Sequence, residues 1–577
     1  MAQTKINPIF RLMPSLTDVA FLLPIVFLFS RMEGMRTLLA DGDTGWHIRT
    51  GEWILAHHQI PHQDIFSFTM PNGPWYAWEW LWDVGAAVLF QHWGLGAVAL
   101  ASLFIICLTF ALLFRVVNRA CGNPLIAIGL AVLAASGSTI HWLARPHLVT
   151  MLFTAVFVAI LQRVREGRVK LLWWLPVLTI VWTNLHGGFL VGIVILGAYG
   201  AGELVRAVLA AASAERRAAF RSALPYLAAA AGCAAASLIN PYGYQLHKHI
   251  VEYFQDPYLL KYIAEFQSSS FHESASAFLE AMLVFGLGAA VWCGMRKRFG
   301  EAILLVGWAH LALVSERNIP IFMIVAAPVT AMAMVEWMEA LRKAVVVRWL
   351  PWVAEQFESI AEEIAPMERL WRTHAISAAA LVVIGLAISS PAAGPLLKPE
   401  FNPKSFPAGA LAMLNASQRI FTSDQWGDYL IYRLSPQGVK VFVDGRSDFY
   451  GAKFGQDYID VMNVKYDWKE TLEKYGVDTI LLSVDSALAG AVKESGSWRV
   501  VYDDGLTIVC QRTADAHKAS DFNSALEGIS PLAGPRAQHA GFAANKLPSA
   551  ATMEEERDRK VTEPHVIAQR ITVNKKL

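Results

Sequence analysis

Long apolar segments recur along most of this chain and restrict what it can fold into. They lie at residues 16–36, 95–117, 124–142, 146–162, 171–184, 188–210, 223–240, 276–295, 300–315, 318–338 and 374–392. A helix of about 20 apolar residues crosses a bilayer. Of the 577 residues, 55% are hydrophobic and only 17% charged, which excludes an ordinary soluble protein. We therefore expect an α-helical polytopic membrane protein with about 11 transmembrane helices.

Basic residues indicate how these segments are oriented. Lys and Arg collect in alternate connections, at residues 115–119, 163–170, 206–221, 296–298 and 342–372. Short cytoplasmic loops are enriched in these residues. The pattern places the N-terminus in the cytoplasm and the first segment in the membrane as a retained span. It places the polar loops at 37–94, 141–147, 184–188, 240–274 and 315–320, and everything after Pro391, outside a bacterial cytoplasmic (inner) membrane.

The first outer loop, most marked from Leu39 to Trp82, is too polar to cross a bilayer. It contains several acidic and histidine side chains interleaved with tryptophans, which settle at membrane–water boundaries. The titratable candidates are Asp41, Asp43, His47, Asp64 and Glu79. We expect this loop to lie on the membrane surface, with residues 79–93 as an interfacial helix, and to carry the chemistry.

The sharpest motif in that loop is Asp41-Gly42-Asp43. Two carboxylates in a glycine-containing turn can converge on a divalent metal such as Mg or Mn, or on an acceptor hydroxyl that one of them deprotonates. The alternative is that Asp43 caps the helix that follows. Asp64 and Glu79 form a second acidic patch. The alternative is that Asp64 is a turn residue and that Glu79 is an interface residue beside the tryptophans.

Two arginines lie at outer ends of expected spans, where orientation does not require them. Arg145, in HWLARPH, and Arg317, in SERNIP, can grip a phosphate through bidentate hydrogen bonds. The alternative is that they reach to lipid headgroups. Polar residues of the neighbouring outer loops could bind a sugar or phosphate, or serve only as structural groups at helix ends: Asn184, His186, His141 and His147.

The chain changes character after the last apolar segment. From about 396 to 512, short β-branched runs alternate with helical patterns, which indicates a soluble α/β domain. Asp444, Arg446 and Asp448 follow a strand there, as a secondary binding site or a structural salt bridge. Residues 513–577 lack periodicity, and we expect a disordered tail. The first domain is then 1–395.

Other motifs are absent from the sequence. The five cysteines have no paired or metal-ligand spacing, so neither a zinc site nor a disulfide framework is expected. No HExxH, P-loop or GxSxG motif occurs in a supportive context. The net charge of +1 identifies no partner, and we expect no nucleic-acid partner.

The first loop carries a resemblance to a known family. DGDTGWHIRTGEWIL and GPWYAWEWLWDVG, with the span count and the outer C-terminal domain, resemble the GT-C superfamily of polyprenyl-phosphate-dependent glycosyltransferases. Its members include protein O-mannosyltransferases, aminoarabinose transferases and oligosaccharyltransferases. The resemblance implies that an acidic residue of this loop acts as base towards the acceptor or binds a metal. Asp43 matches that role best, and Asp41 is the next candidate. Asp43-Thr44 stands where the family often has Asp-Glu.

These observations together predict a membrane glycosyltransferase that passes a sugar from a polyprenyl-phosphate donor to a lipid, glycan or protein acceptor on the outer face. Arg145 and Arg317 would hold the lipid phosphate, and loop 240–274 would close over the site. The further substrate-binding candidates are Asn184, His186, His47, Glu79, Asp64 and His147. Two alternatives stay open: a transporter or flippase of lipid-linked saccharides, and a non-catalytic envelope assembly protein.

Overall fold

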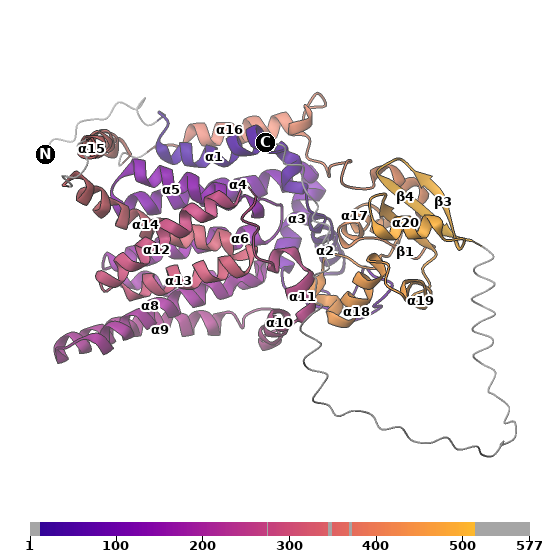
Figure 1. Ribbon diagram of the computed structural model, residues 1–577, viewed down its shortest axis with the longest axis horizontal. Helices are drawn as coiled ribbons and strands as arrows, with labels where there is room; N and C mark the ends of the chain where they lie inside the picture. The colour runs from indigo at the N-terminus through magenta and orange to yellow at the C-terminus, as the bar shows by residue number, and fades with distance from the viewer. Residues whose placement is uncertain (1–11, 274, 344–348, 369–371, 514–577) are drawn as a thin grey trace, which may run out of the picture. The chain divides into compact units, whose positions relative to one another are not determined.

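The computed structural model describes residues 12–273, 275–343, 349–368 and 372–513 (Figure 1). Residues up to Gln511 form one compact unit. The predicted disordered tail lies, from residue 514 onwards, outside the described residues.

Apolar helices lie side by side in a bundle (Figure 1). Within the described ranges, five are long and apolar enough to cross a membrane, at Leu95–Cys121, His147–Arg165, Gly187–Leu209, Ser276–Met295 and Glu316–Arg342. Four shorter apolar helices lie at Pro124–Gly137, Val169–Leu185, Phe299–Val314 and Ala375–Ile388. The helical membrane class is thus confirmed, and the count of about 11 spans stays a prediction.

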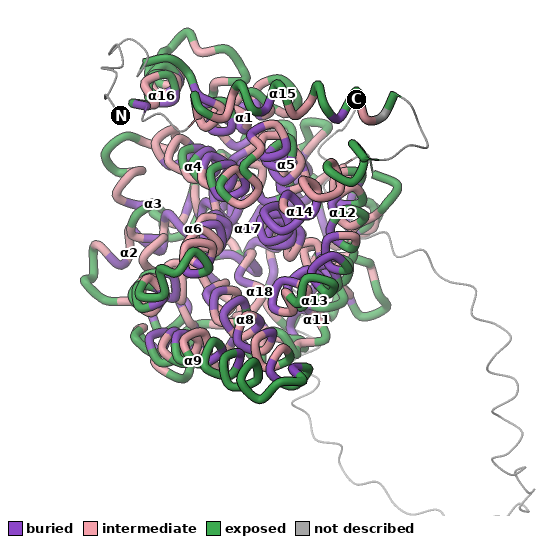
Figure 2. Tube along the Cα trace, turned by 90° about the vertical axis from the view of Figure 1, so that its left-hand side faces the viewer, coloured by how far each residue is buried: buried purple, intermediate pink, exposed green. Residues whose placement is uncertain are grey.

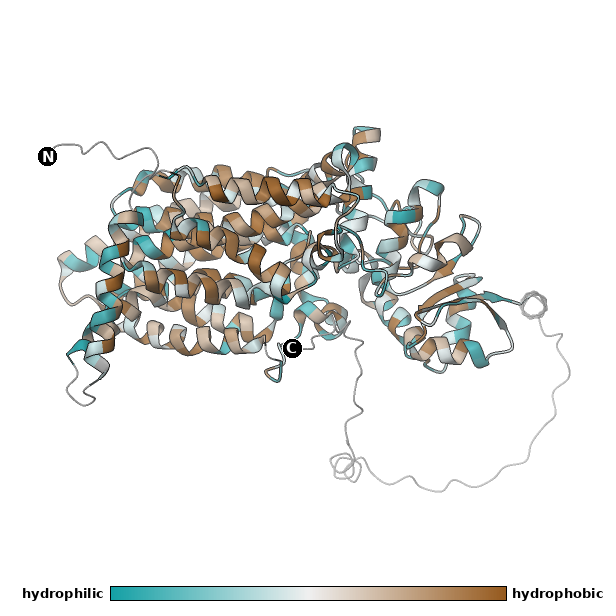
Figure 3. Ribbon diagram, turned by 90° about the horizontal axis from the view of Figure 1, so that it is seen from above, coloured by the Kyte–Doolittle hydropathy of each residue, from teal (hydrophilic) through white to brown (hydrophobic). Residues whose placement is uncertain are grey.

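The helices of the bundle are α1 and α4 to α9, then α12 to α14 and α16. Their bounds are α1 (Leu16–Arg31), α4 (Leu95–Cys121), α5 (Pro124–Gly137), α6 (His147–Arg165), α7 (Leu175–Leu185), α8 (Leu190–Leu209), α9 (Ser213–Ala236), α12 (Ser276–Met295), α13 (Phe299–Val314), α14 (Ile319–Arg342) and α16 (Ala375–Ile388). Apolar residues run along them and hydrophilic residues gather at their ends (Figure 3).

Small residues allow the bundle helices to approach closely. In α14 the segment IPIFMIVAAPVTA is buried throughout, as the colouring in Figure 2 shows. A Cβ added to Gly202 of α8 would lie 2.0 Å from the backbone nitrogen of Gly300, at the start of α13. Small residues at helix contacts are the usual route to tight packing in membranes.

The first loop is built from two helices packed together. After the 3₁₀ turn η2 (Gly34–Leu39) come α2 (Asp43–His57) and α3 (Trp80–Trp93). A Cβ on Gly51 would lie 1.9 Å from the carbonyl oxygen of Asp83, so this glycine permits the close crossing of α2 and α3. A helix at 79–93 is confirmed, and its place at the membrane surface remains a prediction. The connection at 342–372, which the basic residues place in the cytoplasm, contains the helix α15 (Leu350–Glu368).

The C-terminal part, for which the sequence predicts an α/β domain, contains a small mixed sheet. Its strands are β1 (Ile420–Phe421), β2 (Thr479–Ser483), β3 (Trp498–Asp503) and β4 (Thr507–Arg512), in the order β1-β2-β4-β3. β1 and β2 are parallel, and β2 and β4 are antiparallel. The helices around it are α17 (Asp424–Leu434), α18 (Ser447–Met462), α19 (Trp468–Lys474) and α20 (Ala487–Glu494).

The first loop also joins this sheet directly. Val441 makes parallel bridges to Ile420 of β1 and to Ser67 of the first loop. The Phe68 amide donates to the Val441 carbonyl, and the Val441 amide donates to Phe66, both at 3.1 Å. The segment around Ser67 therefore extends the edge of a sheet whose strands lie more than 350 positions later in the chain.

Candidate functional site

The acidic turn of the first loop lies against α17. Gly42 is the N-cap of α2 and its amide donates to the side-chain carbonyl of Gln425 at 2.8 Å. A Cβ on Gly42 would lie 2.5 Å from the Gln425 backbone oxygen, so a larger residue would push the two elements apart. Asp43 begins α2 but its carboxylate makes no capping bond; Asp41 accepts instead from the Asp43 amide at 2.8 Å. The Asp43 carboxylate is therefore free for other contacts.

Arg145 collects carboxylates from two loops. Its Nη1 donates to Asp41 Oδ2 at 2.7 Å and to Glu265 Oε1 at 2.8 Å, and its Nη2 lies 2.8 Å from Asp43 Oδ2. Burial opposes its charge, but these carboxylates outweigh burial and raise the pKa of Arg145. The guanidinium thus remains charged and connects the first loop to loop 240–274.

Asp43 also faces a carboxyl group from the C-terminal domain. Asp43 Oδ1 and Asp428 Oδ2 are buried without a hydrogen-bond partner. Both lie next to the point that a Cβ on Gly445 would take, at 2.1 Å and 2.8 Å from it. Asp428 Oδ1 accepts from the Gly445 amide at 2.8 Å. Two buried carboxylates so close cannot both be charged at low cost.

Burial raises the pKa values of both Asp43 and Asp428. It raises the pKa of Asp43 to about 7, against the opposing effect of Arg145. Burial, with the neighbouring Asp43, raises the pKa of Asp428 well above its usual range. Burial therefore favours a shared proton on this pair of carboxyls, and Asp43 can exchange a proton near neutral pH. A group with a pKa near the operating pH suits general-base catalysis.

Glu79 lies at the centre of a second buried group. Its Oε2 is 3.7 Å from His47 Nε2 and its Oε1 is 3.5 Å from His186 Nε2. His47 Nδ1 bonds Asp83 at 2.6 Å. Burial raises the pKa of Glu79 to about 8 and lowers the pKa of His186 to about 3, so both are neutral at pH 7.

Hydrogen bonds decide the tautomer of His186. The Gly188 amide donates to Nδ1 at 3.1 Å, which makes Nδ1 an acceptor. Trp182 Nε1 donates to the Thr150 hydroxyl oxygen. The Thr150 hydroxyl in turn donates its proton to His186 Nδ1, at 2.7 Å. The proton of the neutral ring is therefore on Nε2, directed at Glu79.

Arg317 also contacts loop 240–274. It lies in the 3₁₀ turn η7 (Glu316–Asn318), and its guanidinium stacks over Phe266, 4.4 Å from the ring centre. Nη2 lies 3.9 Å from Glu265 Oε2, and Nη1 donates to the Tyr253 hydroxyl at 3.3 Å. Both arginines that the sequence singled out thus meet at Glu265.

Three predicted site residues have their polar atoms in structural contacts. Asn184 accepts from Trp80 Nε1 at 2.8 Å and donates to two backbone carbonyls. His147 Nε2 donates to the His141 carbonyl at 2.7 Å. Asp64 accepts from two backbone amides and a serine hydroxyl of its own turn and pairs with Arg446 at 2.7 Å.

In the secondary site, Arg446 pairs with Asp444 at 2.7 Å, which is the structural salt-bridge alternative. Asp448 instead contacts His249 of α10 (Tyr244–Gln255), at 2.9 Å. The sequence reasoning missed Asp428 and Glu265. Glu265 stands in a loop that was predicted to cover the site, but nothing in its neighbours marks it; Asp428 is hidden in a helical pattern, SDQWGDYL.

The carboxylates do not form an evident metal centre. Within the described parts of the chain, no group of three or more His, Cys, Asp or Glu is arranged to hold a metal ion. The Arg145 guanidinium lies between Asp41 and Asp43, in the place that a bridging cation would need. These two residues alone therefore do not fit the predicted Mg or Mn site.

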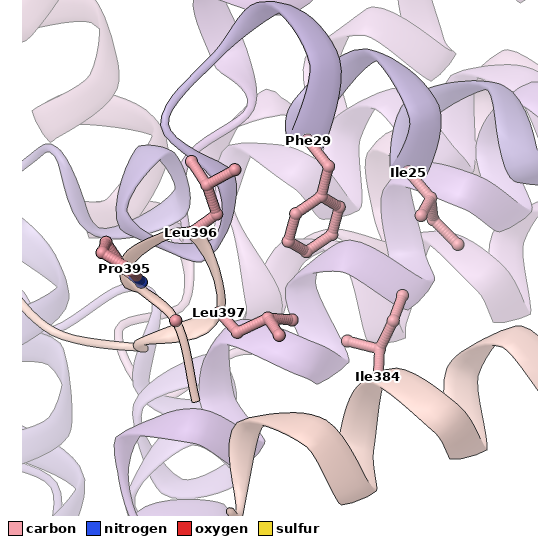
Figure 4. A pocket seen from close by; sticks show the side chains of 7 residues that line it. Ile25, Phe29, Ile384, Pro395, Leu396 and Leu397 are labelled. Atoms are coloured by element: carbon pink, nitrogen blue, oxygen red, sulfur yellow. The ribbon is translucent and has the colours of Figure 1, made fainter. Parts of the chain in front are cut away.

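Two hollows lie away from this cluster. One, of about 410 Å³, is lined by apolar residues of α1, α16 and the turn at 395–397 (Figure 4). Its labelled side chains, among them Phe29 and Ile384, offer no ionisable group to a substrate. The other, of about 400 Å³, is lined by Met70 and by residues of α18 and α19, with Tyr475. Neither contains a residue of the Arg145 cluster.

Comparisons with known proteins give matches among solved structures alone. No family model and no curated protein matches this chain. The structure of ArnT from Cupriavidus metallidurans in the apo state matches with a TM-score of 0.43 and 16% identity, over 86% of this chain and 97% of that one. ArnT from the same organism bound to undecaprenyl phosphate matches with a TM-score of 0.43 and 16% identity, over 89% and 99%.

An oligosaccharyltransferase is also matched. The Archaeoglobus fulgidus enzyme, in complex with Zn and sulfate, aligns with a TM-score of 0.46 and 12% identity, over 86% of this chain and 73% of that one. Because these TM-scores are below 0.5, the matches assign no role to any residue of this chain.

Proposed function

We propose that this protein is a membrane glycosyltransferase that transfers a sugar from a polyprenyl-phosphate donor to a hydroxyl acceptor on the outer face of the membrane. The observation that carries the proposal is the meeting of Asp43, whose pKa is raised to about 7, with Arg145 and Glu265 in one buried cluster. Base and phosphate-binding cations are the two kinds of group that this reaction needs. The ArnT neighbour bound to undecaprenyl phosphate supports a donor of this class.

In the proposed reaction, Asp43 takes the proton of the acceptor hydroxyl. The acceptor oxygen then bonds to the anomeric carbon as the bond from that carbon to the phosphate oxygen breaks, and the phosphate leaves with the electron pair. Attack opposite to the leaving group inverts the anomeric centre. Asp41 and Asp428 do not react; they hold Asp43 through its amide and through the shared buried space.

Arg145 and Arg317 would receive the phosphate as its charge develops. Guanidinium groups bind phosphate through paired hydrogen bonds, and donors aimed at a developing charge lower the barrier. A phosphate leaving group needs little acid catalysis, so a base and a cationic clamp are chemically sufficient. His186, Glu79 and His47 would line the sugar site, whereas Asn184 would hold Trp80 in place.

The test is transfer by the purified full-length protein in liposomes, with radiolabelled polyprenyl-phosphate sugars and an envelope extract as acceptor. Asp43→Asn removes the base without changing its shape, and loss of a general base lowers rates by about 10²–10⁴-fold. Asp485→Asn, at an exposed position in the C-terminal domain, is the matched control. Undiminished transfer by Asp43→Asn would remove Asp43 from the mechanism.

The same assay separates the alternatives. A flippase would move labelled lipid-linked saccharide between leaflets without forming a new glycosidic bond. An assembly protein would keep its function in Asp43→Asn and lose it when residues 401–512 are deleted. Addition of a chelator tests the predicted divalent metal: transfer that stops with chelator and returns with Mg or Mn would establish it.

The proposed orientation has its own test. A reporter that is active only outside the cytoplasmic membrane should be active when fused after Arg512 and silent when fused at Gly167. The reverse pattern would place Asp43 on the cytoplasmic side.

A further inference from the structure

Glu265 occupies the space between the two arginines. Its Oε1 lies 2.8 Å from Arg145 Nη1 and its Oε2 lies 3.9 Å from Arg317 Nη2. One carboxylate therefore bridges two guanidinium groups that come from separate loops of the bundle. Carboxylates and phosphates meet guanidinium donors with the same paired geometry.

The backbone around Glu265 is held independently of its side chain. Glu265 is the middle residue of the turn η6 (Ala264–Phe266). The Ser315 hydroxyl donates to the Glu265 carbonyl at 2.7 Å, and the Glu316 amide donates to the Gln267 carbonyl at 2.9 Å. Because these bonds involve main-chain oxygens, the carboxylate can leave the arginines by rotation of its side chain while the turn stays in place.

The two arginines are already paired with carboxylates, so the cluster has no excess positive charge to bind a further anion. Arg145 and Arg317 supply two positive charges, and Asp41, Asp43 and Glu265 supply carboxylates to them. Burial alone would raise the pKa of Glu265, but Arg145 and Arg317 lower it well below its usual range, so the side chain stays charged. A phosphate that joined this group would add at least one negative charge to a buried cluster.

Of the carboxylates, Glu265 is the one that can give way. Asp41 also accepts from the Asp43 amide, and Asp43 is 5% exposed beside Asp428. The Glu265 side chain is 29% exposed, the most open of the three. Water can therefore solvate it as it leaves, which lowers the cost of breaking its ion pairs.

We propose that Glu265 is a built-in competitor of the phosphate group: its carboxylate occupies the arginine pair until the phosphate of the lipid displaces it. This inference rests on the proposed function, since it deepens the phosphate clamp. It gives loop 240–274 a defined task, because the residue that leaves the arginines belongs to that loop. Glu265 thereby sets the affinity for the phosphate and is a positioning residue, since it does not touch the reacting atoms.

The experiment measures binding rather than turnover. Undecaprenyl phosphate is titrated into the full-length protein in nanodiscs, with undecaprenol and inorganic phosphate as separate ligands. Glu265→Gln keeps the shape but removes the competing charge, and we expect it to bind undecaprenyl phosphate about tenfold more tightly than the wild type, the equivalent of one charge-assisted hydrogen bond. Undecaprenol binding should not change. Glu252→Gln, at an exposed residue of α10 in the same loop, should bind like the wild type.

The outcomes separate this inference from the proposed function. If the wild type binds undecaprenyl phosphate, and Arg145→Gln does not, but Glu265→Gln binds no more tightly, Glu265 is only a structural counter-ion and the inference is wrong. If no variant binds the lipid phosphate, the proposed function fails and the inference with it. Tighter binding of inorganic phosphate alone would assign the subsite to free phosphate and overturn the lipid source.

Glu265→Asp covers the case in which Glu265→Gln does not fold. The shorter side chain keeps its charge but reaches the arginines less well, so its affinity for undecaprenyl phosphate should lie between those of the wild type and Glu265→Gln. A weaker affinity than that of the wild type would contradict competition.

Discussion

Two arginine–carboxylate clusters hold the first loop, and they differ in how far they are buried. Arg446 donates to Asp444 through Nε at 2.8 Å and through Nη2 at 2.7 Å, and the same Nη2 reaches Asp64 at 2.7 Å. Its side chain and those of both partners are at most 1% exposed, and its guanidinium stacks over Trp75, 4.5 Å from the ring centre. The Arg145 side chain is 20% exposed.

The two clusters also differ in which atom lacks a partner. In the Arg145 cluster a carboxylate oxygen, Asp43 Oδ1, is buried without a hydrogen-bond partner, whereas in the Arg446 cluster the atom without a partner is Nη1 of the arginine. Asp43 in addition faces Asp428. A fully buried cluster whose carboxylates are all paired holds structure, whereas a partly exposed cluster with an unpaired carboxylate oxygen and a raised pKa is typical of a functional site. The same residue types therefore stabilise the fold in the Arg446 cluster and form the proposed catalytic site in the Arg145 cluster.

The largest expected effect is on stability, from the Arg446 cluster. Arg446→Met leaves Asp444 and Asp64 buried without their cation, and loss of one partner of a buried pair costs about 3–5 kcal/mol. The thermal midpoint of the purified protein in detergent should fall clearly. Arg433→Met, at an exposed residue of α17, should leave it unchanged. A stable Arg446→Met protein would break the comparison.

Arg145→Gln should lower the transfer rate strongly and the stability only modestly. Removal of a donor to a developing charge lowers kcat by about 10²–10³-fold, while the partial exposure of Arg145 keeps the loss of stability below that of Arg446→Met. Transfer rate and thermal midpoint are measured on the same preparations. Equal losses of stability in Arg145→Gln and Arg446→Met would show that Arg145 has a structural role like that of Arg446.

Glu79 gives a pH-dependent effect of intermediate size. Its pKa is raised from 4.5 to about 8, so the folded state holds the proton more tightly than the unfolded state. The stabilisation by this group is complete below pH 4.5 and is lost as the pH rises towards 8, with a slope of at most about 1.4 kcal/mol per pH unit for one proton. Glu79→Gln mimics the protonated form. Its thermal midpoint should match that of the wild type at pH 5 and exceed it at pH 8.5; parallel curves would contradict the raised pKa.

The smallest expected effect concerns Asp428. The Asp428 carboxyl beside Asp43 lowers the pKa of Asp43, in opposition to burial. Asp428→Leu removes this polar neighbour, so the pKa of Asp43 should rise and the acidic limb of the pH–rate profile should move to higher pH. Asp428→Asn keeps a donor and should leave the limb near its wild-type position. A shift of equal size in both variants would show that the donor has no such role.

Local sequence patterns were sufficient for much of the fold. The apolar segments predict the helices of the bundle, and the alternation of short runs with helical patterns predicts strands and helices in the part of the chain that contains β1 to β4 and α17 to α20. The polar loops that were predicted on one side do meet: Arg145 contacts Asp41, His186 lies near Glu79, and Arg317 lies near Glu265. Hydrophobic period and charge placement are local properties, so they can be read without the tertiary structure.

Some assignments could not come from local patterns. Asn184 and His147 stand in polar outer loops like His186, yet their polar atoms are bonded to Trp80 and to backbone carbonyls. Whether a polar side chain is free or already satisfied depends on neighbours that are distant in sequence. A sequence motif identifies the residue type but not its partners.

The sequence by itself determined that the chain spans a membrane, that Asp41 and Asp43 form an acidic turn after the first apolar segment, and that two arginines stand at span ends. Only the tertiary structure decided that Asp428 faces Asp43 and that Glu265 bridges Arg145 and Arg317. The physical reason is distance along the chain: Asp428 comes 385 positions after Asp43. A pKa raised by burial beside a second carboxyl exists only when packing brings both out of water.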